Sequence, residues 1–183
     1  MTAQTVAACC FLGLASFAAG KGAPEQALPR IASPEALAIE MAKALVSDDR
    51  QRFTALAATR EEMEGMLEAA WRPTRPEDRQ YVKDKVAEIL ADRGEDFDTF
   101  QAMKKKADFK EGAGVRFELT ALAPIYVKDG MTKVRRSRVR MFQATEGGRE
   151  ECFLISLDDM FLFPRGWAFT SVAPGIGKET SKK

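Results

Sequence analysis

The first half of the chain spaces its hydrophobic residues as amphipathic helices do. A helix is predicted to begin at Ser33-Pro34-Glu35, because serine caps a helix, proline suits the first helical position and an acid follows. Residues 59–62 form a capping box that starts another helix, with a short helix between the two. The apolar faces of the three are Leu37, Met41, Ala44 and Leu45, then Phe53 and Leu56, then Met63, Met66, Leu67, Ala70 and Trp71.

Two more helices are predicted before the pattern changes. Thr74 and Glu77 form a capping box around Pro76, and the helix that follows is expected to end near Gly94. A further helix is expected after Gly94. The apolar faces of these two helices are Val82, Val86, Ile89 and Leu90, then Phe97, Phe100 and Met103.

After Gly112 apolar and polar residues alternate, which predicts β-strands. A long half-buried strand is expected over residues 115–127, in which Pro124 indicates an edge position or a bulge. Lys128-Asp129-Gly130 fits a three-residue hairpin loop with glycine in the left-handed position.

The loop length fixes the register of this hairpin. A three-residue loop places Leu119 opposite Val139, whereas a two-residue loop of Asp129-Gly130 would set Leu119 against Arg140 and bury a charge. We therefore predict the three-residue loop, which also brings Glu118 opposite Arg140. Further predicted pairs are Phe117 with Met141, Met141 with Phe153, Val139 with Ile155, and residues 161–163 with residues 167–169.

Helices followed by alternating strands predict an α+β fold. N-terminal amphipathic helices are expected to pack on a C-terminal antiparallel meander sheet of about four to five strands. A chain of 183 residues accommodates one such domain with flanking segments. We expect a signal peptide at 1–20, a linker at 21–32, a single α+β domain at 33–173 and a flexible tail at 174–183.

The opening residues predict an export signal. Residues 6–19 form an apolar run of about 14 residues, shorter than the roughly 20 of a membrane span, and no lysine or arginine precedes it. Small residues at Ser16 and Ala18 suit cleavage by signal peptidase after Ala18. Ala18-Ala19-Gly20 offers a second cleavage site, after Gly20. The alternatives are a buried N-terminal helix and a membrane-anchored lipoprotein lipidated at Cys9. The predicted location is secreted or periplasmic, without a transmembrane span in the mature chain.

The amino-acid composition excludes several kinds of catalytic and binding site. The chain contains no histidine, which removes Ser-His-Asp and Cys-His catalysis, most catalytic metal sites and most pH switches. Its net charge of +1 gives no field that favours nucleic acid. If the leader is removed, Cys152 is the one cysteine left and has no intramolecular disulfide partner. We predict no cofactor, no metal and no nucleic-acid partner.

Three arginines are candidate binding residues. Arg136, Arg138 and Arg140 lie on one face of a predicted strand, where they can bind an anion or a polar partner surface. The alternative interpretation is a solvated sheet face, salt-bridged to Glu118 and other acids.

Aromatic and acidic residues supply the other candidates. Tyr126 can line a pocket, as can Trp71 and Trp167, although aromatic residues at such spacings usually lie in the core. Asp158-Asp159 fits turn chemistry better than a catalytic carboxylate pair.

Two segments resemble nuclear-transport-factor-like domains. Residues 34–56, with paired acids before Phe53 and Leu56, are similar to the first helical hairpin of that family, and FLFPRGWAFTSV resembles its last hairpin. The resemblance covers about Ser33 to Ala173 and departs from many members in having no predicted strand between the helices. Cystatin-like domains are the neighbouring possibility, although their Gln-x-Val-x-Gly loop is absent.

This resemblance implies either catalysis or binding. The family includes isomerases and dehydratases that work in a cone between sheet and helices, and many non-catalytic binding or assembly modules. Its enzymes typically use an Asp–His pair or an aspartate with a tyrosine, so Tyr126 with an acid is the candidate in this chain. Fold alone does not decide between these roles.

We predict an exported, non-enzymatic domain that binds a small molecule or a protein partner. The alternatives are a histidine-free cone enzyme that uses Tyr126, and a structural module that forms a homodimer through its sheet. An enzyme requires a pocket with a carboxylate of raised pKa beside a tyrosine. A binding module requires an apolar pocket without one, and an assembly module requires a filled cone with an exposed apolar sheet face.

Overall fold

The computed structural model describes residues 28–107, 109, 115–145, 150–172 and 174–179. Within these ranges four helices precede an antiparallel sheet of six strands, which confirms the predicted α+β class. The predicted signal peptide lies outside the described residues. The elements are α1 (Pro34–Val46), α2 (Arg50–Leu56), α3 (Arg60–Trp71), α4 (Pro76–Lys106), β1 (Arg116–Leu122), β2 (Tyr126–Lys128), β3 (Met131–Ala144), β4 (Glu150–Phe163), β5 (Gly166–Phe169) and β6 (Gly175–Lys178).

Two of the three predicted helix starts are confirmed. The Ser33 hydroxyl accepts a hydrogen bond from the Ala36 amide at 3.2 Å, and Thr59 and Glu62 form the predicted capping box of α3. The predicted box at Thr74 is wrong, because α4 begins one residue later with Arg75 as its N-cap and no side-chain cap bond. A proline at the first helical position donates no N–H, so this start leaves one fewer amide to satisfy.

Helix α4 continues past Gly94, where the sequence predicted a break. It runs for 31 residues without interruption. Val82 and Val86 are buried on one side of Gly94, and Phe97 and Phe100 are buried on the other. Packing of both halves outweighs the roughly 1 kcal/mol that a mid-helix glycine costs. None of the helices in the described ranges has the length and apolarity of a membrane span.

The sheet has the order β1-β3-β4-β5, with β2 paired to β3 and β6 paired to β4. The predicted pairings of Leu119 with Val139 and of Met141 with Phe153 are confirmed. The predicted pairing of the last hairpin is wrong by one residue, because residues 161–163 pair with residues 166–168 across a two-residue turn. The expectation of four to five strands falls short by at least one. A break around Pro124 divides the first predicted strand into β1 and β2, and part of the predicted tail pairs as β6.

The predicted three-residue loop is wrong, although the predicted register of Phe117–Leu119 in β1 is right. Lys128 pairs with Met131, so Asp129-Gly130 form a two-residue turn, and both have positive φ, 53° and 76°. That conformation suits a tight hairpin. The register then shifts by one residue between Leu119 and Ala121. This bulge restores the apolar pairing that the loop length alone would have lost.

The predicted flexible tail is ordered at Gly175–Lys178. This segment pairs with β4 opposite residues 153–156, on the edge of β4 that β5 leaves open. Beyond it, the Arg140 guanidinium binds both carboxylate oxygens of Glu179 at 2.7 and 2.8 Å. The glycine-, lysine- and serine-rich composition predicted a flexible segment, but the hydrogen bonds to β4 and the ion pair with Arg140 hold it on the sheet.

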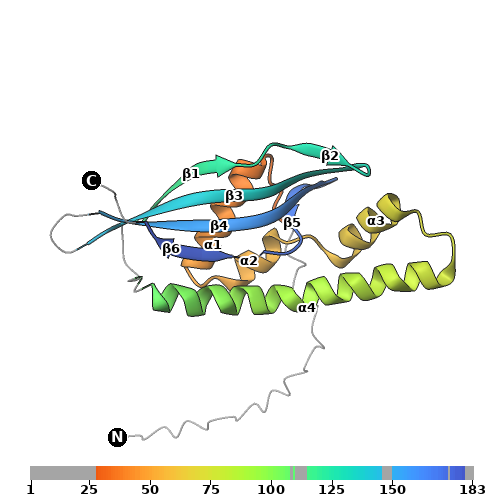
Figure 1. The fold of residues 1–183 in the computed structure, drawn as a ribbon, viewed down its shortest axis with the longest axis horizontal. Coiled ribbons are helices and arrows are strands. Elements are labelled where there is room, and N and C mark those ends of the chain that lie inside the picture. The colour runs from red at the N-terminus through yellow and green to blue at the C-terminus, as the bar shows by residue number, and fades with distance from the viewer. Residues whose placement is uncertain (1–27, 108, 110–114, 146–149, 173, 180–183) are drawn as a thin grey trace, which may run out of the picture.

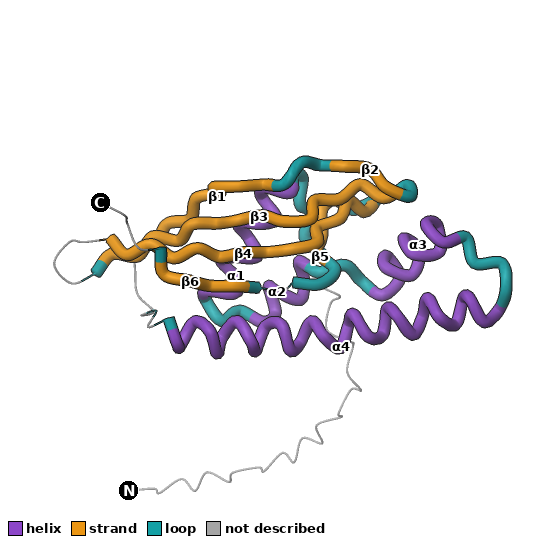
Figure 2. The backbone as a smooth tube through the Cα atoms, viewed as in Figure 1, coloured by secondary structure: helices purple, strands orange, loops and turns teal. Residues whose placement is uncertain are grey.

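The helices and the sheet enclose two apolar clusters. Helix α1 contacts β1, β3, β4 and β5, so it crosses one face of the sheet (Figure 2). With α2 and the C-terminal half of α4 it encloses the main cluster. Helix α4 passes along the β6 edge and extends beyond the sheet, where α3 folds back on it (Figure 1). There α3 and the first half of α4 pack on Phe161, Phe163 and Ala168 to form a second cluster.

A local distortion of β4 links the two clusters. Leu157 and Met160, three residues apart, both belong to the main cluster, whereas Phe161 and Phe163 belong to the second. Between them Asp159 has φ 47°, in the left-handed region. A regular strand turns alternate residues to one face, so the change of face at Asp159 directs the two phenylalanines toward α3.

Candidate functional site

An apolar groove lies between α3 and the far end of the sheet. Its volume is about 480 Å³, within the range of small-molecule sites. The walls come from α3, from the β2–β3 turn and from the end of β4 with the turn that follows it. The apolar side chains that line it include Met66, Ala69, Met131, Phe161, Phe163 and Pro164.

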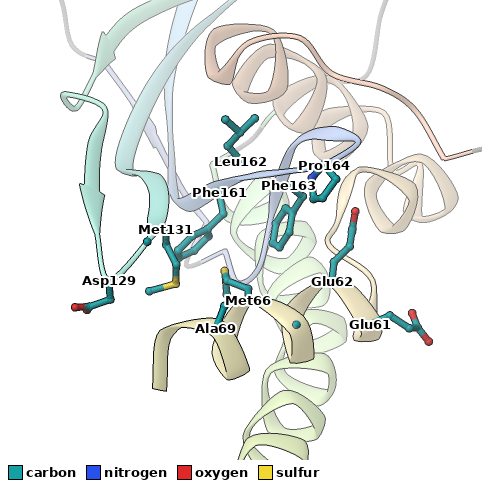
Figure 3. Close-up of a pocket in the computed structure, with 12 residues that line it drawn as sticks. Glu61, Glu62, Met66, Ala69, Asp129, Met131, Phe161, Leu162, Phe163 and Pro164 are labelled. Carbon is teal, nitrogen blue, oxygen red and sulfur yellow. The ribbon is translucent and has the colours of Figure 1, made fainter. Parts of the chain in front are cut away.

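The apolar side chains converge from opposite walls. Figure 3 shows Met66 of α3 directed toward Phe161 and Phe163 of β4, with Met131 beside them. The two phenylalanine rings have centroids 6.4 Å apart. Methionine side chains are unbranched and polarizable, so they adjust to apolar guests of different shape.

Arg165 fixes the wall formed by the β4–β5 turn. Its guanidinium binds the Glu62 carboxylate at 2.8 Å, the carbonyl oxygen of Ala57 at 2.6 Å and that of Pro29 at 3.0 Å. Both side chains of the ion pair are largely buried. Gly166 follows with φ 125°, and a Cβ there would lie 2.4 Å from the Ile31 carbonyl oxygen, so this turn requires glycine.

Three of the described residues that line the groove carry a carboxylate. Hydrogen bonds from its own backbone amide and from the Thr59 hydroxyl lower the pKa of Glu61. Glu62 is held in the ion pair with Arg165. Asp129 occupies the exposed β2–β3 turn. The described lining of the groove is therefore mainly apolar, with its carboxylates supplied by α3 and the β2–β3 turn.

A second, polar cavity of about 560 Å³ lies on the sheet near Asp159. Its lining includes Arg135, Arg136, Asp158 and Asp159. The Arg136 guanidinium binds Asp158 at 3.3 Å. Burial raises the pKa of the Asp159 carboxyl, and the positive charge of Lys133 opposes that shift.

The four predicted site residues do not gather in one cavity. Arg136 binds Asp158, Arg140 binds Glu179, and Arg138 is exposed. These ion pairs fit the interpretation of a solvated, salt-bridged face. Tyr126 is half-buried, with the Lys133 ammonium 5.3 Å from its ring centroid. It is absent from the described residues that line the groove or the polar cavity.

Sequence reasoning missed the groove because it missed the change of face in β4. The sequence of β4 contains one indication of this change of face. Phe153, Ile155 and Leu157 alternate, and then Met160 and Phe161 stand side by side. Two adjacent apolar residues in an alternating strand indicate such a change.

The charge state of Asp159 gives a testable pH dependence. Its raised pKa means that the folded state binds the proton more tightly than the unfolded chain, so this carboxyl destabilises the fold as pH rises above about 4. Asp159→Asn keeps a residue that tolerates φ 47° and removes the charge. We expect its Tm to exceed that of the wild type at pH 7 and to match it near pH 3.

Two variants serve as comparisons for Asp159→Asn. Asp129→Asn alters an exposed aspartate of similar φ, so it should show no such pH-dependent gain. Asp159→Ala removes the same charge, but it should be about 1 kcal/mol less stable than Asp159→Asn at both pH values, because alanine tolerates the left-handed region poorly. Thermal unfolding followed by circular dichroism measures all three, and a Tm gain of Asp159→Asn that is equal at pH 3 and pH 7 would contradict the assignment.

Among the described residues, no group of three cysteine, aspartate or glutamate side chains is arranged to hold a metal ion.

The resemblance to nuclear-transport-factor-like and cystatin-like domains stays a prediction. No family model, curated protein or solved structure matches this chain.

Proposed function

We propose that this protein is a non-enzymatic binding domain that holds a small apolar ligand in the groove between α3 and the sheet. The observation that carries the proposal is an apolar groove of about 480 Å³ whose described lining holds no tyrosine beside its carboxylates. An apolar pocket of this kind suits a binding module, whereas an enzyme of the cone type requires a tyrosine beside an acid of raised pKa.

The enzyme alternative has weaker support. Asp159 has a raised pKa, and Lys133 lies near both it and the Tyr126 ring. However, the described lining of the Asp159 cavity does not include Tyr126, and its lining arginines and aspartates are mostly exposed or ion-paired to each other. Tyr126 and an acid therefore do not share either of these two cavities. Tyr81 and Asp78 do line a further cavity of about 440 Å³, but a hydrogen bond from Arg75 lowers the pKa of Asp78, which does not fit a general acid of raised pKa.

We also propose that the mature chain is exported, as residues 1–20 predict. We expect the protein purified from its own cells to begin at Ala19 or Lys21. N-terminal sequencing with intact-mass measurement tests this. An unprocessed Met1 would contradict export through a cleaved signal, and a lipid on Cys9 would indicate the lipoprotein alternative.

Gly65 allows the groove to be blocked without disturbing its walls. It lies in α3 and lines the groove, and a Cβ placed on it meets no atom within 4 Å. Because Gly65 lines the groove, we expect the longer side chain of Gly65→Leu to occupy part of the site and the affinity for the neutral apolar dye N-phenyl-1-naphthylamine to fall at least tenfold. Fluorescence titration measures this.

Gly65→Ala is the matched control for the blocked groove. It makes the same gain in helix propensity, about 1 kcal/mol, but adds only a methyl group. We expect it to bind the dye within about threefold of the wild type. Equal dye binding by Gly65→Leu and the wild type, with both folded by circular dichroism, would show that the dye binds elsewhere and would overturn the proposed site.

A further inference from the structure

The charges that border the groove define the ligand more closely, and this inference rests on the proposed function. We propose that the natural ligand is a cationic amphiphile, which is an apolar chain or ring that carries an ammonium or guanidinium group. The apolar part would lie against Met66, Phe161 and Phe163, and the cationic group would lie at the acidic border.

The border of the groove is acidic. Its described lining includes Glu61, Glu62 and Asp129 but no lysine or arginine. Arg165 neutralises Glu62, whereas neither Glu61 nor Asp129 forms an ion pair within the ranges that the structure describes. Figure 3 shows Asp129 on one side of the apolar side chains and Glu61 on the other. A ligand chain lying between them would therefore have a carboxylate near each end.

Two of the cations near the groove, Lys133 and Arg60, are already engaged. The Lys133 ammonium lies 5.4 Å from the Phe161 ring centroid and 5.3 Å from that of Tyr126, and it also faces Asp159. Arg60 reaches Glu64 at 3.7 Å. Because hydrogen bonds lower the pKa of Glu61, its carboxylate stays charged at neutral pH. The border thus attracts a cationic group and repels an anionic one.

Three amphiphiles with the same decyl chain but different head-group charge distinguish the effect of charge on binding from the effect of the apolar chain. Decyltrimethylammonium, decyl maltoside and decyl sulfate are each titrated, below their critical micelle concentrations, into the full chain with bound N-phenyl-1-naphthylamine. We expect the cationic compound to displace the dye about three- to tenfold more effectively than the neutral one, and the anionic compound least effectively. The preference should shrink in 0.5 M salt, because exposed charges are screened.

Variants that remove the acidic charges test whether Glu61 and Asp129 cause the preference for the cationic compound. Glu61→Gln with Asp129→Asn should bring the cationic compound to the affinity of the neutral one, without changing the affinity of the neutral one. Asp48→Asn is the matched control, since Asp48 is another exposed aspartate of similar φ, in the α1–α2 connection. It should leave the cation preference intact.

The outcomes separate this inference from the proposed function. Equal displacement by all three compounds, or the strongest displacement by decyl sulfate, would overturn the cationic ligand while leaving the apolar site standing. A cation preference that survives the double substitution would also overturn the inference. Displacement by none of the three, combined with equal dye binding by Gly65→Leu, would instead overturn the proposed function.

Discussion

Arg93→Met is expected to lower the free energy of unfolding by about 2–3 kcal/mol. Arg93 is only 8% exposed, and its guanidinium donates hydrogen bonds to the carbonyl oxygens of Ala58 and Thr170, each at 3.1 Å. Methionine fills much of the same volume but donates nothing, so two acceptors in the interior lose their donor. Each buried group left unsatisfied costs about 1–3 kcal/mol, and removal of a buried charge offsets part of that loss.

The effect of Arg93→Met should extend to the groove. Ala58 lies between α2 and α3, and Thr170 follows β5, so Arg93 ties the middle of α4 to both. Although burial lowers the pKa of Arg93 to about 10, the side chain stays protonated at neutral pH and can make these bonds. We therefore expect weaker binding of N-phenyl-1-naphthylamine as α3 loses this support.

Urea unfolding measures the Arg93 prediction. Arg79→Met is the control, because Arg79 is an exposed arginine on the same helix and its loss should change stability by less than about 0.5 kcal/mol. Arg93→Lys should fall between the wild type and Arg93→Met, since one ammonium reaches two carbonyls less well than a planar guanidinium. An Arg93→Met protein as stable as the wild type would contradict a supporting role for this residue.

Phe53→Ala is expected to cost about 3–5 kcal/mol, the largest effect that we predict. Phe53 is 1% exposed, and its ring centroid lies 5.2 Å from that of Phe97 and 4.7 Å from that of Phe169. The substitution removes apolar contacts with α4 and with β5 and leaves a cavity in the main cluster. Thermal and urea unfolding measure the loss.

Tyr81→Ala is the matched surface control for Phe53→Ala. Tyr81 is 58% exposed and stacks on Trp71 with centroids 5.6 Å apart, so its removal should cost about 1 kcal/mol or less. A loss of under about 1.5 kcal/mol for Phe53→Ala would mean that the main cluster does not depend on this aromatic contact between α2, α4 and β5.

The sequence predicted the parts of the fold that local patterns govern. The capping box at residues 59–62 and the pairing of Leu119 with Val139 follow from residue types and alternation. The continuity of α4 through Gly94 could not be predicted in this way, because it depends on the two clusters that bury its halves. The order at Gly175–Lys178 likewise depends on an open edge of β4, which no local pattern reveals.

The candidate site was harder to predict than the fold. Its apolar side chains were assigned to helix faces and a hairpin, which is correct, but their convergence requires the change of face at Asp159. Arg136, Arg138 and Arg140 were predicted to bind a ligand because three cationic side chains on one strand face can hold an anion. In the structure two of those three arginines bind acids, one of them Glu179 beyond β6.

Methionine methyl resonances offer the most direct test of the binding groove. Met66 and Met131 line the groove, whereas Met41 and Met141 are buried in the main cluster. We expect titration with decyl maltoside, below its critical micelle concentration, to shift the methyl signals of Met66 and Met131 in the full chain and to leave those of Met41 and Met141 in place. Shifts confined to Met41 and Met141, or none at any of the four, would contradict the assignment of this groove as the ligand site.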